Sequence, residues 1–287
     1  MFNKRHIVRT IAATASILAL SFTAACGSGQ STASNSADSN DITQQTYKPG
    51  KLTIATGQPA YEPWVMNDKP ESGEGYEAAV AYAVADKLGF KKSDVVWTRT
   101  AFDTAIAPGA KDWDFNIQQF GITDERKKAV DFSSSYYNDS QSVVVKKDSK
   151  FANATKVSDL KDATVGVMVG TLAYDYAKVN IKDDIQTFND DAALAQALDA
   201  GQIDVLVTST VECVYMVQSE QVKDSKVLGR LPDSEDKSGM GIVLPKDSKL
   251  TAAVTKAVDD LNADGTIKKL QDKWLAEYTT DLTELKK

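Results

Sequence analysis

The sequence predicts an α/β protein whose two lobes face each other across a cleft. Apolar, strand-like runs alternate with helical segments in two successive series, and two similar strands bracket the second series. These bracketing strands indicate two crossings between the lobes, with the second lobe in the middle of the chain. Ligands of open α/β sheets bind beyond the carboxyl ends of the strands, which would here line the cleft.

The first series covers roughly residues 51 to 130. In order, we expect strand Lys51–Ala55, helix Glu77–Leu88, strand Val95–Thr98, helix Phe102–Ala107, strand Phe115–Ile117 and helix Asp124–Val130. Gly89 and Pro108-Gly109 end two of these helices. The alternation favours parallel sheets that are covered on both faces.

The second series repeats this alternation without repeating the sequence. It predicts strands Thr164–Val167, Ile185–Phe188 and Val205–Val207, with helices Thr171–Lys178, Ala192–Leu198 and Val211–Gln218. The bracketing strands, Ser142–Lys150 and Gly239–Lys249, each end in a charged turn. The tail, Leu250–Tyr278, predicts two helices that complete the first lobe.

The N-terminus has the features of a signal peptide. Basic residues precede a short apolar stretch from Ile11 to Phe22, which is too short for an ordinary transmembrane helix. Thr23-Ala24-Ala25-Cys26 then resembles a bacterial lipobox, although the usual leucine is replaced by Thr23. We expect Cys26 to be lipidated. Two acyl chains on this residue would give a stable membrane anchor. The alternative is a plain secretory peptide that leaves a cysteine nearby.

The segment after Cys26 is rich in Gly, Ser, Thr, Ala, Asn and Gln, a composition typical of a flexible tether. The predicted organisation is therefore a leader at 1–25, a tether at 26–48, the first part of lobe 1 at 49–141, lobe 2 at 142–240, and the rest of lobe 1 with the C-terminal helices at 241–287.

Composition excludes several kinds of site. The chain has 287 residues and a net charge of -7, which argues against nucleic acid as a partner. Its single histidine, His6, lies in the leader, so the mature chain has no catalytic or zinc-binding imidazole. Cys213 stands in the apolar run VECVYMV and is expected to be a buried structural residue that forms no internal disulfide. We expect no cofactor, metal site or catalytic residue.

Six segments, in order, resemble the family 3 (amino-acid type) solute-binding proteins of ABC importers. They are LTIATGQPAYEPW, GYEAAVAYAVADKLG, FGITDERKKAVDFSSSYY, VGVMVGTLAYDY, ALDAGQIDVLVT and LNADGTIKKLQDKW. The resemblance implies a two-lobe periplasmic-binding-protein-like fold (type II) with two hinge strands. It also implies a monomeric receptor that binds a small polar, amino-acid-like solute and passes it to a membrane permease. The tether would hold this receptor near the permease, with a Gram-positive surface favoured over a Gram-negative periplasm.

The resemblance also suggests how a ligand carboxylate is held. Arg126, within ITDER, matches the family arginine that binds the α-carboxylate, for which a guanidinium fork is well suited. The alternative is a surface cation beside Lys127 and Lys128. Gly170-Thr171 opens a helix whose first N–H groups would also receive an anion, although Thr171 equally suits an ordinary helix cap.

Three aromatic residues match the walls of the family's cleft. Tyr61 and Phe102 are expected to contact the ligand side chain, whereas for Trp64 core packing competes closely with ligand contact. Glu77 is usually acidic in the family too and is expected to be structural.

Several positions depart from the family's pattern. Gln118 and Gln119 replace small residues and would bond a polar ligand or narrow the pocket, and Gly121 replaces a serine. Ser209 stands where many members have an aspartate that pairs with the ligand ammonium. Another acid could supply that charge, a hydroxyl and carbonyls could suffice, or the ligand could lack a free α-ammonium. Gln58 lies near a position that is acidic in family members that bind basic amino acids, so the resemblance favours a polar or neutral ligand over a basic one.

The sequence leaves two other functions open. The fold is also used by dehydratases, in which acids such as Glu77 or Glu62 would perform acid–base work. A ligand sensor for a separate signalling protein is the third possibility.

Overall fold

The computed structural model describes residues 41–279 and 282–287, and it contains two five-stranded sheets. The first sheet has the order β2-β1-β3-β10-β4. Its strands are β1 (Leu52–Thr56), β2 (Val95–Arg99), β3 (Phe115–Asn116), β4 (Val130–Tyr137) and β10 (Met240–Pro245). β1 pairs in parallel with β2 and β3, while β10 is antiparallel to β3 and β4.

The second sheet has the order β7-β6-β8-β5-β9. Its strands are β5 (Gln141–Lys146), β6 (Val165–Met168), β7 (Gln186–Phe188), β8 (Val205–Ser209) and β9 (Ser225–Arg230). β6 is parallel to β7 and β8, and β5 is antiparallel to β8 and β9. Both sheets are therefore mixed rather than purely parallel. In each, the strand that follows a crossing, β5 or β10, runs against its βα-connected neighbours.

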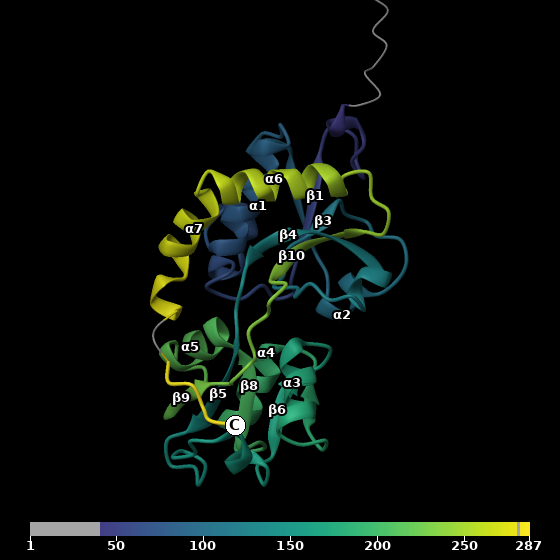
Figure 1. The fold of residues 1–287 in the computed structure, drawn as a ribbon. Coiled ribbons are helices and arrows are strands. Elements are labelled where there is room, and N and C mark those ends of the chain that lie inside the picture. The colour runs from purple at the N-terminus through teal and green to yellow at the C-terminus, as the bar shows by residue number, and fades with distance from the viewer. Residues whose placement is uncertain (1–40, 280–281) are drawn as a thin grey trace, which may run out of the picture. The chain divides into compact units, whose positions relative to one another are not determined.

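Helices cover both sheets (Figure 1). Those of the first lobe are α1 (Tyr76–Lys87), α2 (Phe102–Ile106), α6 (Thr251–Ala263) and α7 (Thr266–Trp274), and those of the second are α3 (Leu172–Asn180), α4 (Asp191–Asp199) and α5 (Thr210–Gln218). The short 3-10 helices are η1 (Ile42–Gln44), η2 (Met66–Asp68), η3 (Pro70–Ser72), η4 (Lys92–Asp94), η5 (Arg126–Lys128), η6 (Val157–Leu160) and η7 (Ala276–Tyr278). Each sheet has hydrophobic clusters on both faces, which gives each lobe its own core.

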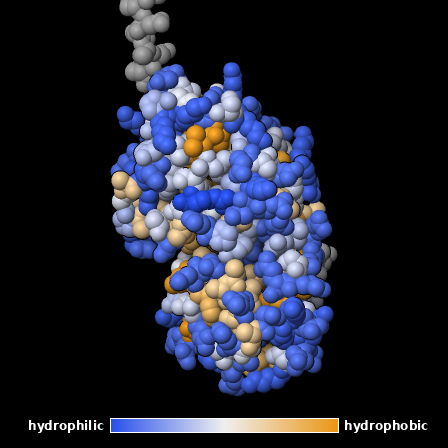
Figure 2. Space-filling view, turned by 180° about the vertical axis from the view of Figure 1, so that it is seen from behind, coloured by the Kyte–Doolittle hydropathy of each residue, from blue (hydrophilic) through white to orange (hydrophobic). Residues whose placement is uncertain are grey.

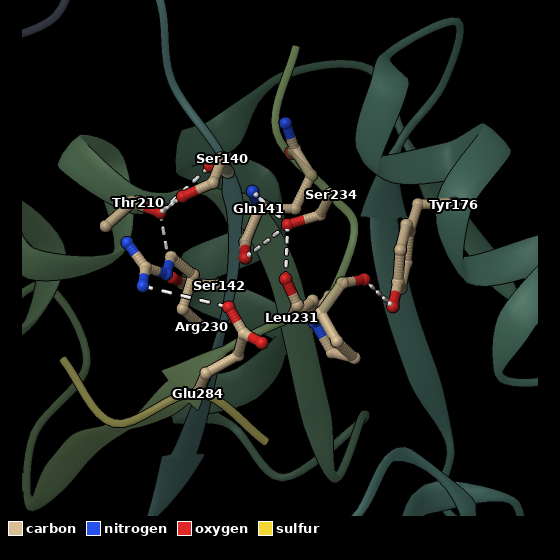
Figure 3. A network of polar contacts seen from close by, with 10 residues as sticks. Ser140, Gln141, Ser142, Tyr176, Thr210, Arg230, Leu231, Ser234 and Glu284 are labelled. Atoms are coloured by element: carbon tan, nitrogen blue, oxygen red, sulfur yellow. Dashed lines mark hydrogen bonds and ion pairs between the residues drawn. The ribbon is translucent and has the colours of Figure 1, made fainter. Parts of the chain in front are cut away.

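The chain crosses between the lobes twice, as the bracketing strands predicted. It leaves the first sheet through residues 138–140 and returns through residues 231–239 (Figure 1). The two crossings are bonded to each other, since Asp236 N donates to Asp139 O at 2.9 Å and Leu231 N donates to Gln141 O at 2.8 Å. Ser234 Oγ adds a bond from Gln141 N at 3.0 Å (Figure 3). This bonded pair of connections forms the hinge region.

One predicted helix is wrong. Instead of a helix over Asp124–Val130, the chain makes only the η5 turn, and Val130 already begins β4. β4 and β9 were not predicted, because the serines of VDFSSSYY and the polar residues of SKVLGR weaken the apolar strand pattern. Tertiary pairing with β10 and β5 establishes them as strands.

The two ends of the described chain differ from the predicted organisation. Residues 41–48, expected to belong to the tether, include the η1 turn and the buried Thr46, and Tyr47 N donates to Asp114 Oδ1 at 2.5 Å. At the other end, residues 241–287 were all expected in lobe 1. However, Glu284 lies beside Arg230 of the second lobe (Figure 3). Lys286 pairs with Lys156 of the same lobe, where Leu285 is buried. The leader, Cys26 and the rest of the tether lie outside the described residues.

The face drawn in Figure 2 is mostly hydrophilic, with small separate hydrophobic areas. The large hydrophobic side chains that are exposed in the described part of the chain are dispersed along it, at Tyr47, Val169 and Val179. Within that part, no helix has both the length and the apolar character required to cross a membrane.

Candidate ligand-binding site

A cavity of about 230 Å³ lies beyond the carboxyl ends of strands from both sheets. β1 and β3 reach it from the first lobe, and β6, β7 and β8 reach it from the second. The predicted ligand residues that line it are Tyr61, Trp64, Phe102, Gln118, Gln119, Gly121, Arg126, Thr171 and Ser209. Gly170 is not among the lining residues. The cleft therefore lies where the strand order predicted it.

Arg126 is held at the contact between the lobes. Its backbone N–H donates to Thr123 Oγ at 3.1 Å, so Thr123 caps the turn that carries it. The guanidinium donates from Nη1 to Gly121 O and from Nη2 to Gly170 O, both at 2.7 Å. It also lies 5.4 Å from the Phe102 ring centroid. A guanidinium has five N–H donors, so these bonds leave capacity for a ligand carboxylate.

The local charges keep Arg126 cationic. Burial lowers its pKa, while the nearby Asp175 and Asp236 carboxylates raise it. An arginine pKa starts so high that the side chain stays protonated under such an influence.

Thr171 acts as the N-cap of α3. Its hydroxyl accepts from Tyr174 N at 3.2 Å and donates to Met168 O at 2.8 Å. Gly170 has a positive φ of 73°, and it offers its carbonyl to Arg126. The first turn of α3 therefore starts beside the guanidinium, which is where its N–H groups would meet the same anion.

The aromatic residues have different positions. Trp64 is only 1% exposed and packs edge-on against Tyr137, with 5.5 Å between ring centroids, so it belongs to the core of the first lobe. Its indole Nε1 nevertheless donates to Glu212 Oε2 across the lobes at 3.2 Å. Tyr61 OH accepts from Ala192 N at 3.4 Å, and Phe102 stacks near Phe120 at 4.7 Å.

The buried carboxylate of Glu77 holds Gln119, one of the two glutamines that line the cavity, in place. Glu77 accepts from Gln119 N at 2.7 Å and from the Gln119 side-chain amide, and it also accepts from Tyr136 OH. Burial raises the Glu77 pKa to about 7 despite these bonds. The side-chain oxygen of Gln118 is buried and, within the described residues, has no hydrogen-bond partner. It is therefore an acceptor available to a ligand.

Gly121 has a steric reason to lack a side chain. A methyl group there would lie 2.6 Å from Leu172 Cδ1 and 2.8 Å from Asp236 Oδ2. Leu172 belongs to the second lobe and Asp236 to a crossing segment. The departure from serine at this position therefore permits close approach of the lobes.

Acidic side chains that sequence reasoning missed also line the cavity. They are Asp139, Asp190, Asp191, Glu212 and Asp236. Burial raises the pKa of Asp139 and of Asp191 to about 6, and it raises that of Glu212 well above its ordinary value. The sequence offered one sign of these buried acids, which is Glu212 within the apolar helix VECVYMV. No group of three or more His, Cys, Asp or Glu side chains in residues 41–279 and 282–287 is arranged to hold a metal ion.

Two α/β lobes, two bonded crossings and a cavity between them that charged side chains help to line define a two-lobe ligand-binding protein. The family model "bacterial extracellular solute-binding proteins, family 3" matches residues 52–277, so the chain belongs to this family.

Similar proteins come from several bacteria. The L-cystine-binding protein TcyJ of Escherichia coli (strain K12) is 29% identical over 223 residues, covering 77% of this chain and 81% of the relative. The L-arginine-binding protein of Pseudomonas aeruginosa is 28% identical over 245 residues, covering 80% of this chain and 88% of the relative. The solved structure of an ancestral arginine-binding protein bound to arginine is 31% identical, has a TM-score of 0.67, and matches over 78% of this chain and 98% of its own.

Proposed function

We propose that the protein is the extracellular substrate-binding receptor of an ABC importer and that it binds a small amino-acid-like solute. The observation that carries this proposal is the cavity between the lobes, where a cationic Arg126 and several carboxylates line the same space. An amino acid presents both charges, so it complements such a lining. Closure of the lobes about the two crossings would enclose the solute.

Arg126 would bind the ligand carboxylate together with the N–H groups at Gly170 and Thr171. Gln118, Gln119 and Ser209 would meet polar groups, and Gly121 would allow the lobes to close. Tyr61 and Phe102 would contact the side chain, with Trp64 as support rather than the main wall.

We further propose that the ligand has a polar or neutral side chain. Gln58 lines the cavity and favours a polar or neutral ligand over a basic one. The relatives include an L-cystine-binding protein and an L-arginine-binding protein, so a ligand panel should contain both amino acids.

We also propose a lipid anchor at Cys26, a leader at 1–25 and a monomeric receptor that docks on a membrane permease. Globomycin-sensitive processing, and loss of membrane association on Cys26→Ser, would support the anchor. A Cys26→Ser protein that stays in the membrane fraction would contradict it.

A thermal-shift panel of amino acids, α-hydroxy acids, amines and sugars tests the receptor function. A ligand at 100 times its dissociation constant stabilises the folded protein by about 2.7 kcal/mol. We expect stabilisation by one or a few amino acids. If only sugars or amines stabilise the protein, the proposal fails.

An enzyme on the same fold is the second candidate, and the buried acids of the cavity favour it, since a general acid needs a raised pKa. Mass spectrometry of each stabilising compound after long incubation separates the two. A receptor leaves the compound unchanged, whereas an enzyme converts it.

A further inference from the structure

Ser209 cannot supply the charge that an ammonium group needs. Its hydroxyl accepts from Glu212 N at 3.3 Å and thereby caps α5. A cap of this kind satisfies a backbone donor that would otherwise be unpaired. The Ser209 side chain therefore has a structural role.

Glu212 lies one helical turn further along and brings a carboxylate to the cavity. The residue is only 3% exposed. Oε2 accepts from Trp64 Nε1 at 3.2 Å, but nothing in the described residues bonds to Oε1. A buried acceptor without a partner is unfavourable by about 1–3 kcal/mol, and by more when it is charged. Oε1 can therefore accept a hydrogen bond from a ligand donor.

The surroundings of Glu212 are acidic. The ionisable groups that act on it are Asp191, Asp139 and Glu77, and burial together with these carboxylates favours its protonated form. The charge of Glu212 also contributes to raising the pKa values of Tyr61, Tyr215 and Cys213. Arg126 is engaged elsewhere, with Gly121 and Gly170. An incoming cation would relieve the repulsion among these acids.

We infer that Oε1 of Glu212 accepts a hydrogen bond from the ammonium group of the ligand, so that Glu212 supplies the negative charge that Ser209 cannot. This inference rests on the proposed receptor function and makes it narrower. The ligand then has a free ammonium as well as a carboxylate. Acids without an amino group, and N-acylated amino acids, are excluded as tight ligands.

The test uses isothermal titration calorimetry with whichever amino acid stabilises the protein most, beside its α-hydroxy and N-acetyl analogues. Glu212→Gln keeps the shape and an acceptor for Trp64 but removes the charge. We expect it to weaken amino-acid binding about 10- to 100-fold and to leave the weaker α-hydroxy-acid binding within a factor of about three. Glu220→Gln, an exposed acid just beyond the same helix, is the matched control and should change neither. In Glu212→Gln, the added substitution Ser209→Asp should recover part of the affinity.

Proton release gives a second readout that needs no variant. Burial raises the pKa of Glu212, and a bound cation favours its ionised form, so the native protein should release protons on binding and its affinity should rise with pH. Titration in buffers of different ionisation enthalpy measures the release, which should be smaller in Glu212→Gln.

Two results would overturn the inference while leaving the receptor intact. In one, the native protein binds the hydroxy acid as tightly as the amino acid. In the other, a folded Glu212→Gln binds the amino acid with native affinity and native proton release, so that Glu212 serves only Trp64. If Glu212→Gln does not fold, the native protein alone decides, since equal affinity for the amino acid and its hydroxy analogue contradicts the inference. A native protein that binds no amino acid refutes the proposed function itself.

Discussion

The surroundings of Arg126 and of Glu212 differ in how each charge is satisfied. Arg126 already donates to two carbonyls, one from each lobe, whereas Glu212 has an oxygen without a partner in the described structure. The guanidinium is held in place before any ligand arrives, because its bonds fix its orientation. The carboxylate remains unfavourable until a donor arrives. Arg126 therefore orients the ligand, and the ligand in turn supplies the hydrogen bond that Glu212 Oε1 lacks.

The largest expected effect is on the cationic side. Arg126→Ala should weaken binding of the amino acid by roughly 2–5 kcal/mol, because a buried carboxylate would lose its charged partner. Calorimetry measures this loss. Lys127→Ala, which removes an exposed neighbouring cation, is the control. Native affinity in Arg126→Ala would mean that the carboxylate is bound elsewhere.

Glu77 offers a contrast, since its carboxylate is fully bonded yet still buried. Its folded-state pKa of about 7 exceeds the ordinary value of 4.5. The folded protein therefore binds this proton more tightly than the unfolded chain does, and stability falls as pH rises from about 4.5 through 7, by about 3 kcal/mol. Urea unfolding at pH 5 and pH 8 should show a smaller decline in Glu77→Gln than in the native protein. Equal declines would show that Glu77 does not carry the effect.

A substitution at Gly121 tests whether the lobes must approach closely for Arg126 and Glu212 to bind the ligand. A methyl group there meets Leu172 and Asp236, so Gly121→Ala should disfavour the closed form by roughly 1–3 kcal/mol. Ligand affinity should fall, and the ligand-induced decrease in radius of gyration seen by X-ray scattering should shrink. Leu172→Ala added to Gly121→Ala should restore part of both. If the single variant closes and binds normally, the contact is not a feature of closure.

The smallest expected effect belongs to Ser209. Ser209→Ala removes the cap of α5 and should lower stability by about 1 kcal/mol, and it should weaken ligand binding less than Glu212→Gln does. Thermal unfolding and calorimetry measure the two quantities. A large loss of affinity with unchanged stability would place the ligand ammonium at Ser209 rather than at Glu212.

Local patterns predicted much of the fold. β1, β2 and α1 begin and end within two residues of their predictions, because apolar periodicity and a terminal Gly89 mark them in the sequence. The missed strands β4 and β9 depend on partners distant in the chain. The C-terminal residues 284–286 likewise join the second lobe through Arg230 and Lys156. No local sequence pattern predicts this pairing.

The candidate site was predictable to a similar extent. Arg126 and Tyr61 came from segments that resemble a family, and the structure brings both to one cavity. Whether they bind a ligand stays a prediction. Asp139, Asp191 and Glu212 were missed because each belongs to a different segment, and only folding gathers them. An acid inside an apolar helix, as in VECVYMV, was the available sign of a buried charge in need of a partner.

A crystal structure with the tightest-binding amino acid tests the central claim most directly. The account predicts carboxylate oxygens within hydrogen-bonding distance of the Arg126 guanidinium, and the ammonium nitrogen within about 3 Å of Glu212 Oε1. A ligand whose ammonium points away from Glu212, with Oε1 still unbonded or bonded only to water, would contradict it.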